Sequence, residues 1–217
     1  MPDYAAQRLN MVESQVRTND VPDPHIQAAM RDIPRERFVP AAKRALAYAE
    51  VAVEVVPGRF LLEPRTLAKL LRLADIGPED RILAVGCTTG YAAAVAARLA
   101  KKVTGVETDV DLVRVASDML PAVGAANAEV VQGSLADGHR AGAPYDVILI
   151  EGAVETVPEA LLAQLAEGGR LVAVVQEGTQ GRAHLFVRSH GHIGDRPDFD
   201  ASAPLLPGFR KTVGFVF

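Results

Sequence analysis

The residues best placed to do chemistry surround one glycine turn, in the stretch from Arg81 to Glu107 (RILAVGCTTGYAAAVAARLAKKVTGVE). Gly86 and Gly90 follow a short apolar run, and an alanine-rich stretch with larger apolar residues at helical spacing comes after them. Backbone N–H groups in such a turn and at a helix N-terminus are suited to bind a ligand. Glu107 lies about 20 residues further on, where its carboxylate suits the hydroxyls of a ribose.

Each part of this pattern also has a purely structural explanation. Gly86 and Gly90 could simply permit a tight turn and close packing of a helix on a sheet. Glu107 could be a solvated strand end. The combination and its spacing favour a ligand site over these separate explanations.

Alternating strands and helices predict an α/β fold that positions this turn. The run RILAV at 81–85 is typical of a strand buried on both faces, and a helix is expected at 90–100. Residues 183–189 and 212–217 lack a helix between them, which favours a C-terminal antiparallel pair. The remaining expected elements are strands at 103–106, 129–131, 145–150 and 170–175, and helices at 109–120 and from 158 to about 167.

Four strand ends are expected to meet at one edge of the parallel sheet. They are Gly86 to Gly90, Glu107, Gly133 to Leu135, and Glu151 with Gly152. Ligands of open α/β sheets bind at this edge, where the strand order reverses. No second nucleotide-binding half follows, which argues against a dehydrogenase.

The first 78 residues are predicted to form an N-terminal helical extension and a lid loop, and residues 79–217 the core. Helices are expected at 5–17, 25–31 and 41–49. The segment 54–69 (EVVPGRFLLEPRTLAK) has a turn at Pro57 and Gly58, followed by a helix that begins at Pro64. We expect this loop to lie over a bound ligand.

Composition excludes several classes of protein. The formal net charge of −4 over 217 residues argues against a nucleic-acid partner. The single cysteine, Cys87, excludes an internal disulfide and is expected to be small and buried. With no signal peptide or long apolar span, we expect a cytoplasmic protein without a membrane partner. His190 and His192 are interpreted as a chance surface pair, so no metal site is expected. One basic cluster is expected to be solvated surface: Arg31, Arg35, Arg37, Lys43 and Arg44.

Over most of its length the chain resembles the protein-L-isoaspartate O-methyltransferases. The resemblance rests on collinear phrases in family order: MVESQVRTNDV, IPRERFVP, AYAEVAVEV, GRFLLEP, the glycine motif, APYDVILIEGA and PEALLAQLAEGGRLV. It implies a Rossmann-like class I methyltransferase fold that uses S-adenosyl-L-methionine and releases S-adenosyl-L-homocysteine. The implied sheet is mostly parallel with antiparallel C-terminal strands.

The resemblance also implies site residues. The GRFLLEP loop would cover the methyl-transfer site, with Leu62 where active relatives usually carry a hydroxyl, and Thr66 as a substitute one helical turn on. The segment after the third strand would flank the adenine. The implied cofactor-binding residues are Gly86, Cys87, Thr88, Gly90, Tyr91, Glu107, Thr108, Gly133, Ser134, Leu135 and Glu151.

Several positions depart from the family pattern. Ala84 replaces an acidic residue, Thr88 a glycine, and Ser134 an aspartate, whose role Asp137 could take over. An isoaspartyl carboxylate is already ionised near neutral pH, so methyl transfer needs orientation rather than a base. Thr66 and Arg59 could orient it, but we favour interpreting them as a helix-surface threonine and a solvated turn arginine.

Three functions are therefore considered. The first is methylation of a carboxylate in damaged, isoaspartyl protein. The second is a diverged, non-catalytic scaffold that binds S-adenosyl-L-methionine or a partner, and the third is a methyltransferase with another acceptor. The run from Ala203 to Phe209 is expected to be exposed and available to a peptide or partner, or alternatively to pack on the domain as a loop. The sequence does not fix the oligomeric state.

Overall fold

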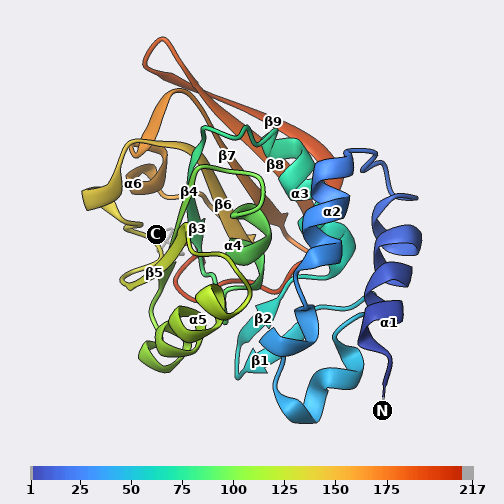
Figure 1. The fold of residues 1–217 in the computed structure, drawn as a ribbon. Coiled ribbons are helices and arrows are strands. Elements are labelled where there is room, and N and C mark those ends of the chain that lie inside the picture. The colour runs from blue at the N-terminus through green and yellow to red at the C-terminus, as the bar shows by residue number, and fades with distance from the viewer. Residues whose placement is uncertain (1, 212–217) are drawn as a thin grey trace.

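A computed structural model describes residues 2–211, which form a seven-stranded sheet flanked by helices (Figure 1). The strand order is β5-β4-β3-β6-β7-β8-β9. Strands β3 to β7 are parallel, and β8 and β9 are antiparallel. The strands span β3 (Arg81–Val85), β4 (Lys102–Glu107), β5 (Ala128–Gln132), β6 (Tyr145–Val154), β7 (Leu165–Glu177), β8 (Gln180–Ser189) and β9 (His192–Asp200).

The order reverses at β3, from which the chain builds outward to β4 and β5 on one side and later to β6 and β7 on the other. Strand β3 is buried on both faces, because successive side chains of a strand point in opposite directions. Ile82 and Ala84 join one apolar cluster, whereas Leu83 and Val85 join the other. The helices of the sheet region are α3 (Pro64–Ala74), α4 (Tyr91–Ala96), α5 (Val110–Ala122) and α6 (Glu159–Leu162).

The N-terminal part lies along one side of the sheet and ends in a hairpin (Figure 1). Its apolar side chains share one cluster with α3 and α4, which continues the core of the sheet. The division of the chain at residue 78 stays a prediction. The elements are α1 (Tyr4–Met11), the π-helical turn η1 (Val12–Val16), α2 (Pro24–Asp32), the 3-10 turns η2 (Arg35–Phe38) and η3 (Ala41–Leu46), and the antiparallel strands β1 (Val53–Val56) and β2 (Arg59–Leu61).

The mostly parallel Rossmann-like sheet is confirmed, with differences at its C-terminal end. The helix begun near Pro158 ends at Leu162, because Leu165 already pairs with Tyr145 in the sheet. Strand β8 pairs antiparallel with β7 and with β9. The strand predicted at 212–217 lies outside the described residues. Strand β9 (HIGDRPDFD) is an exposed edge strand with charges and a proline, so it lacks the apolar alternation that would reveal it. No helix among residues 2–211 is long and apolar enough to cross a bilayer.

Candidate functional site

The glycine turn after β3 has a tightly constrained backbone. Gly86 and Gly90 have φ values of 79° and 93°, and Thr88 between them has a φ of 50°. A β-branched residue rarely adopts this left-handed conformation, and Thr88 is nevertheless fully buried. The turn adjoins the ends of β4 and β6, its neighbours in the sheet, and β5 lies beyond β4. The expected meeting of strand ends is thus confirmed.

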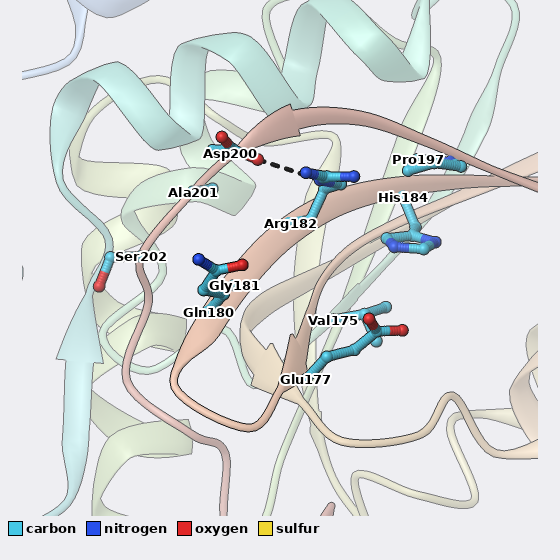
Figure 2. A pocket seen from close by; sticks show the side chains of 10 residues that line it. All are labelled: Val175, Glu177, Gln180, Gly181, Arg182, His184, Pro197, Asp200, Ala201 and Ser202. Atoms are coloured by element: carbon cyan, nitrogen blue, oxygen red, sulfur yellow. Dashed lines mark hydrogen bonds and ion pairs between the residues drawn. The ribbon is translucent and has the colours of Figure 1, made fainter.

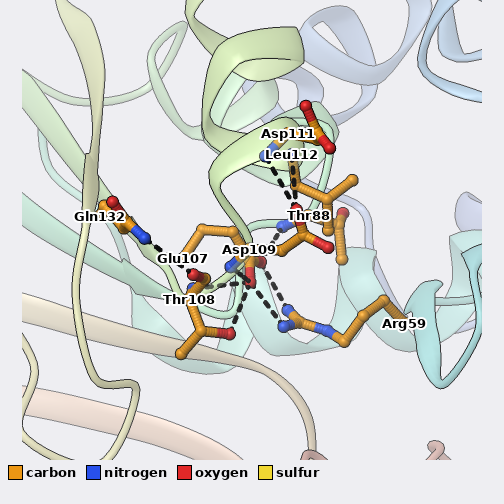
Figure 3. A network of polar contacts seen from close by, with 8 residues as sticks. All are labelled: Arg59, Thr88, Glu107, Thr108, Asp109, Asp111, Leu112 and Gln132. Carbon is orange, nitrogen blue, oxygen red and sulfur yellow. Dashed lines mark hydrogen bonds and ion pairs between the residues drawn. The ribbon is translucent and has the colours of Figure 1, made fainter.

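Glu107, the last residue of β4, is fully buried at the centre of a polar network (Figure 3). Its Oε1 accepts from the backbone N–H of Thr108 at 2.8 Å, and its Oε2 accepts from that of Thr88 at 3.0 Å. Longer contacts to Oε1 come from the Thr108 hydroxyl at 3.2 Å and the Asp109 N–H at 3.3 Å. Asp109 caps α5 by accepting from the N–H groups of Asp111 and Leu112. The carboxylate is therefore held by backbone groups of both neighbouring turns.

The guanidinium of Arg59 completes this network. Its Nη1 and Nη2 donate to Oε1 and Oε2 of Glu107, each at 2.6 Å, as a bidentate pair. Arg59 is only 5% exposed, so its interpretation as a solvated turn arginine was wrong. The hairpin explains the error: Arg59 begins β2, and period-two alternation puts it on the same face as the buried Leu61.

Residues 203–209, here called the C-terminal strap, cross the end of β6. Ala153 N–H donates to the carbonyl of Pro204 at 2.8 Å, and Leu206 N–H donates to the carbonyl of Ala153 at 2.9 Å. Leu206 and Phe209 are 5% and 2% exposed. The expectation that this run is exposed was therefore wrong, and the alternative of a loop packed on the domain is confirmed.

The strap and the hairpin both close over Gly86. A side-chain carbon added to Gly86 would lie 3.1 Å from Cδ2 of Leu206 and 3.2 Å from Nη2 of Arg59. Beside them remains a cavity of about 10 Å³, lined by Gly58, Phe60, Leu62, Glu151, Pro204, Leu205 and Leu206. That is room for about one water molecule. In this conformation the chain's own side chains fill the space above the glycine turn.

Glu151 faces this cavity and is 4% exposed. Its Oε1 has no hydrogen-bond partner among the residues described. Burial first, and then the nearby Glu107 carboxylate, raise the pKa of Glu151 well above its usual range, and Arg59 opposes the shift. Burial also raises the pKa of the Cys87 thiol, which is fully buried as expected.

The other predicted residues occupy different surroundings. Tyr91 packs edge-on against Phe38, with ring centroids 5.6 Å apart. Gly133 donates its N–H to the carbonyl of Glu107 at 2.9 Å, Leu135 is buried, and Ser134 and Asp137 are exposed. Thr66 is 2% exposed and donates its hydroxyl to Oε1 of Glu63 at 2.6 Å, so its interpretation as a helix-surface threonine was wrong.

Arg35 is a buried residue that sequence reasoning assigned to solvated surface, and that expectation was wrong. Its Nε donates to the carbonyl of Ala47 and its Nη2 to that of Leu62, both at 2.7 Å. The guanidinium also lies 4.7 Å from the centre of the Tyr91 ring. Burial lowers the pKa of Arg35, and Tyr91 opposes that shift. Arg35 therefore ties the loop that carries Leu62 to the N-terminal part. The signal available in the sequence was the pair Pro34 and Pro40 at the two ends of PRERFVP, which indicates a fixed turn around Arg35.

A larger hollow of about 600 Å³ lies along β7, β8 and β9 (Figure 2). Arg182 pairs there with Asp200 at 3.0 Å, and His184 contacts Asp195 at 2.8 Å. None of its lining residues belongs to the glycine turn or contacts Glu107. Among residues 2–211, no group of three or more metal-binding side chains is found.

Comparison with known proteins gives one consistent result. A family model described as protein-L-isoaspartate(D-aspartate) O-methyltransferase matches residues 6–197. The protein-L-isoaspartate O-methyltransferase 1 of Rhodopseudomonas palustris (strain HaA2) is 38% identical over 185 residues, which cover 85% of this chain and 75% of the relative. A protein-L-isoaspartate O-methyltransferase of Methylorubrum extorquens (strain PA1) is 38% identical over 214 residues, 96% of this chain and 92% of the relative.

Solved structures agree on the fold. A Plasmodium falciparum protein described as a protein-L-isoaspartate O-methyltransferase, in complex with S-adenosyl-L-homocysteine, superposes with a TM-score of 0.79. It is 20% identical, over 92% of this chain and 97% of that one. Another protein-L-isoaspartate O-methyltransferase also gives a TM-score of 0.79 at 23% identity, over 94% of this chain and 66% of that one.

Proposed function

Because this chain belongs to the protein-L-isoaspartate O-methyltransferase family, we propose that it transfers a methyl group from S-adenosyl-L-methionine to a carboxylate of isoaspartyl protein. The observation that carries this proposal is the buried Glu107 at the end of β4, facing the glycine turn after β3. Ligands of open α/β sheets bind at such strand ends. A cytoplasmic location and the absence of nucleic-acid and membrane partners stay predictions.

The residues that would hold the donor fit its chemistry. Glu107 offers a carboxylate for the ribose hydroxyls, and the turn from Gly86 to Gly90 offers close approach of the backbone. Gly133, Ser134 and Leu135 follow β5 and would flank the adenine. The side chains of Arg59 and Leu206 must move aside to admit the group, because they now lie against Gly86.

When bound, the donor supplies an electrophilic methyl group on a sulfonium. The isoaspartyl carboxylate has an ordinary pKa of about 4, so the chain need not remove a proton from it. The chain's task is to orient that carboxylate and exclude water. Phe60 and Leu62 provide apolar walls but no donor at the small cavity.

Glu151 is the side chain at that cavity that can orient an acceptor. Burial raises the pKa of Glu151 well above its usual range and so favours the neutral carboxyl, and a protonated carboxyl has one O–H to donate. We assign to it the hydrogen bond to the acceptor carboxylate that Leu62 cannot make. An ionised Glu151 would instead repel the acceptor.

The direct test is methyl transfer from radiolabelled S-adenosyl-L-methionine to a synthetic isoaspartyl peptide. The matched aspartyl peptide is the control, and we expect label only in the isoaspartyl form. A second candidate, a non-catalytic family member, is favoured by Leu62 and by the 10 Å³ left at the site. It predicts no transfer to any peptide at millimolar donor, whereas measurable isoaspartyl methylation eliminates it.

A further inference from the structure

We propose that Arg59 is a built-in competitor of the donor's ribose: it fills the two acceptor positions on Glu107 that a cis diol would use, and thereby sets the affinity for the nucleoside. This inference rests on the proposed function, because it concerns the same site. It assigns to Arg59 a role opposite to that of a binding residue.

The hydrogen bonds of Glu107 define the competition. A carboxylate has about four acceptor positions, two on each oxygen. Backbone N–H groups of Thr108 and Thr88 donate to Oε1 and Oε2 at 2.8 and 3.0 Å, and the Thr108 hydroxyl and the Asp109 N–H make longer contacts to Oε1 at 3.2 and 3.3 Å. Arg59 makes one of the two shortest contacts to each oxygen, both at 2.6 Å. Two neighbouring hydroxyls that each donate one hydrogen bond, one to each oxygen, would take the place of these two N–H groups.

The geometry of the two donors makes the substitution chemically reasonable. A guanidinium presents parallel N–H groups in a planar fork, which is why it matches a carboxylate so well. A cis diol also presents two adjacent donors, but without charge. The charged fork makes the stronger hydrogen bonds. A diol must therefore displace Arg59 before it can donate to both oxygens of Glu107.

Leu206 closes the same space from a second element. It contacts the Gly86 position from the C-terminal strap, whereas Arg59 arrives from the β1–β2 hairpin. Leu206 offers no hydrogen bond to Glu107, so it obstructs by volume alone. The two side chains therefore predict different signatures: removing Arg59 favours ligands with a diol, whereas shortening Leu206 favours all nucleosides alike.

A single partner holds the Arg59 guanidinium in the site. Among the residues described, every hydrogen bond of its guanidinium goes to Glu107, and its Nε has no partner. Loss of this one pair therefore leaves the guanidinium without a hydrogen-bond partner among the described residues.

Titration calorimetry on the full chain tests the proposal. The proteins are the wild type, Arg59→Ala, Leu206→Ala, the double variant, and the control Arg17→Ala, whose side chain is 62% exposed and pairs with Glu13 on the surface. The ligands are S-adenosyl-L-homocysteine, adenosine and 2′,3′-dideoxyadenosine. Apparent affinity falls with the fraction of molecules that are open, so we expect Arg59→Ala to bind S-adenosyl-L-homocysteine at least about tenfold more tightly than wild type.

The nucleoside pair identifies the cause of that gain. We expect Arg59→Ala to tighten adenosine several-fold more than its dideoxy analogue, Leu206→Ala to tighten both equally, and Arg17→Ala to change neither. Ligand-free melting curves establish that each variant folds. If Arg59→Ala does not fold, Leu206→Ala alone tests whether the site is closed to the nucleoside.

Two other results have distinct meanings. Wild type that binds S-adenosyl-L-homocysteine as tightly as the variants overturns the competition by Arg59 and leaves the proposed function standing. No binding by any protein, the double variant included, overturns both this inference and the donor assignment. A gain in Arg59→Ala that is equal for both nucleosides contradicts the diol mimicry.

Discussion

Replacing Glu151 by glutamine should change how stability depends on pH. The carboxyl is 4% exposed, and one oxygen has no partner among the described residues. Burial and Glu107 raise its pKa well above the ordinary value of 4.5. The folded state therefore holds this proton to higher pH than the unfolded chain does. The stability that the neutral carboxyl confers is complete below pH 4.5 and is lost as the pH rises towards the folded-state pKa.

The size of the effect follows from proton linkage. While only the folded state is protonated, each pH unit changes the free energy of unfolding by about 1.4 kcal/mol. Between the ordinary pKa and the folded-state pKa, the wild type should thus lose stability by up to about 1.4 kcal/mol per pH unit relative to Glu151→Gln, which keeps the shape but has no proton to lose. The variant should be the more stable protein at the alkaline end.

Urea unfolding at pH 5, 6, 7 and 8 measures this difference. Glu50→Gln, a change at an exposed carboxyl, serves as the control for losing one acidic group. A difference between wild type and Glu151→Gln that stays constant over this range would refute the reasoning, because it would mean that Glu151 titrates alike in both states. Methyl transfer is a separate measurement. Because glutamine still donates a hydrogen bond, a loss of activity in Glu151→Gln larger than its change in stability explains would contradict the orienting role given to Glu151.

Three further predictions concern the same region. Gly86→Ala should destabilise the fold by about 1–3 kcal/mol in urea unfolding, because the added carbon meets Leu206 and Arg59 at a left-handed φ; unchanged stability would contradict the tight packing. Arg35→Lys should cost about 2–4 kcal/mol, since one ammonium cannot serve both carbonyls of the planar fork; full stability would show that the second hydrogen bond is dispensable. Leu62→Ser should raise kcat for an isoaspartyl peptide by about tenfold, because its hydroxyl adds a second donor beside Glu151, and an unchanged kcat would mean that the hydrogen bond from Glu151 alone orients the acceptor.

Elements near the glycine turn could be predicted from sequence because their signals are local. Strand β3 is an apolar run with a charge before it and a glycine after it, and β4 ends in the acid at 107. Strand β9 could not be predicted, because an exposed edge strand has no buried face that would require apolar and polar residues to alternate. The strands of the β1–β2 hairpin could not be predicted because they span only four and three residues.

The occupants of the site could not be predicted for a different reason. Arg59 and Glu107 are 48 residues apart in the chain, and no local pattern joins them. Leu206 reaches Gly86 only because the C-terminal strap folds back over β6. Contacts of this kind depend on the assembled sheet. The sequence shows which residue types are present, but it does not show that these residues contact one another.

This distinction changes what an acid at the end of β4 signifies. Three backbone N–H groups and the Arg59 fork donate to Glu107, so its burial alone does not require a nucleotide, and its place at the end of β4 beside the glycine turn is what points to one. A diol would need to hydrogen-bond the two oxygens where Arg59 now donates to them. The glycine at 86 is likewise required by Leu206 and Arg59 as much as by a ligand. We therefore expect donor affinity in this family member to depend on the residue that faces the acid as well as on Leu206, and a relative with a neutral side chain at position 59 should bind the nucleoside without the competition from Arg59.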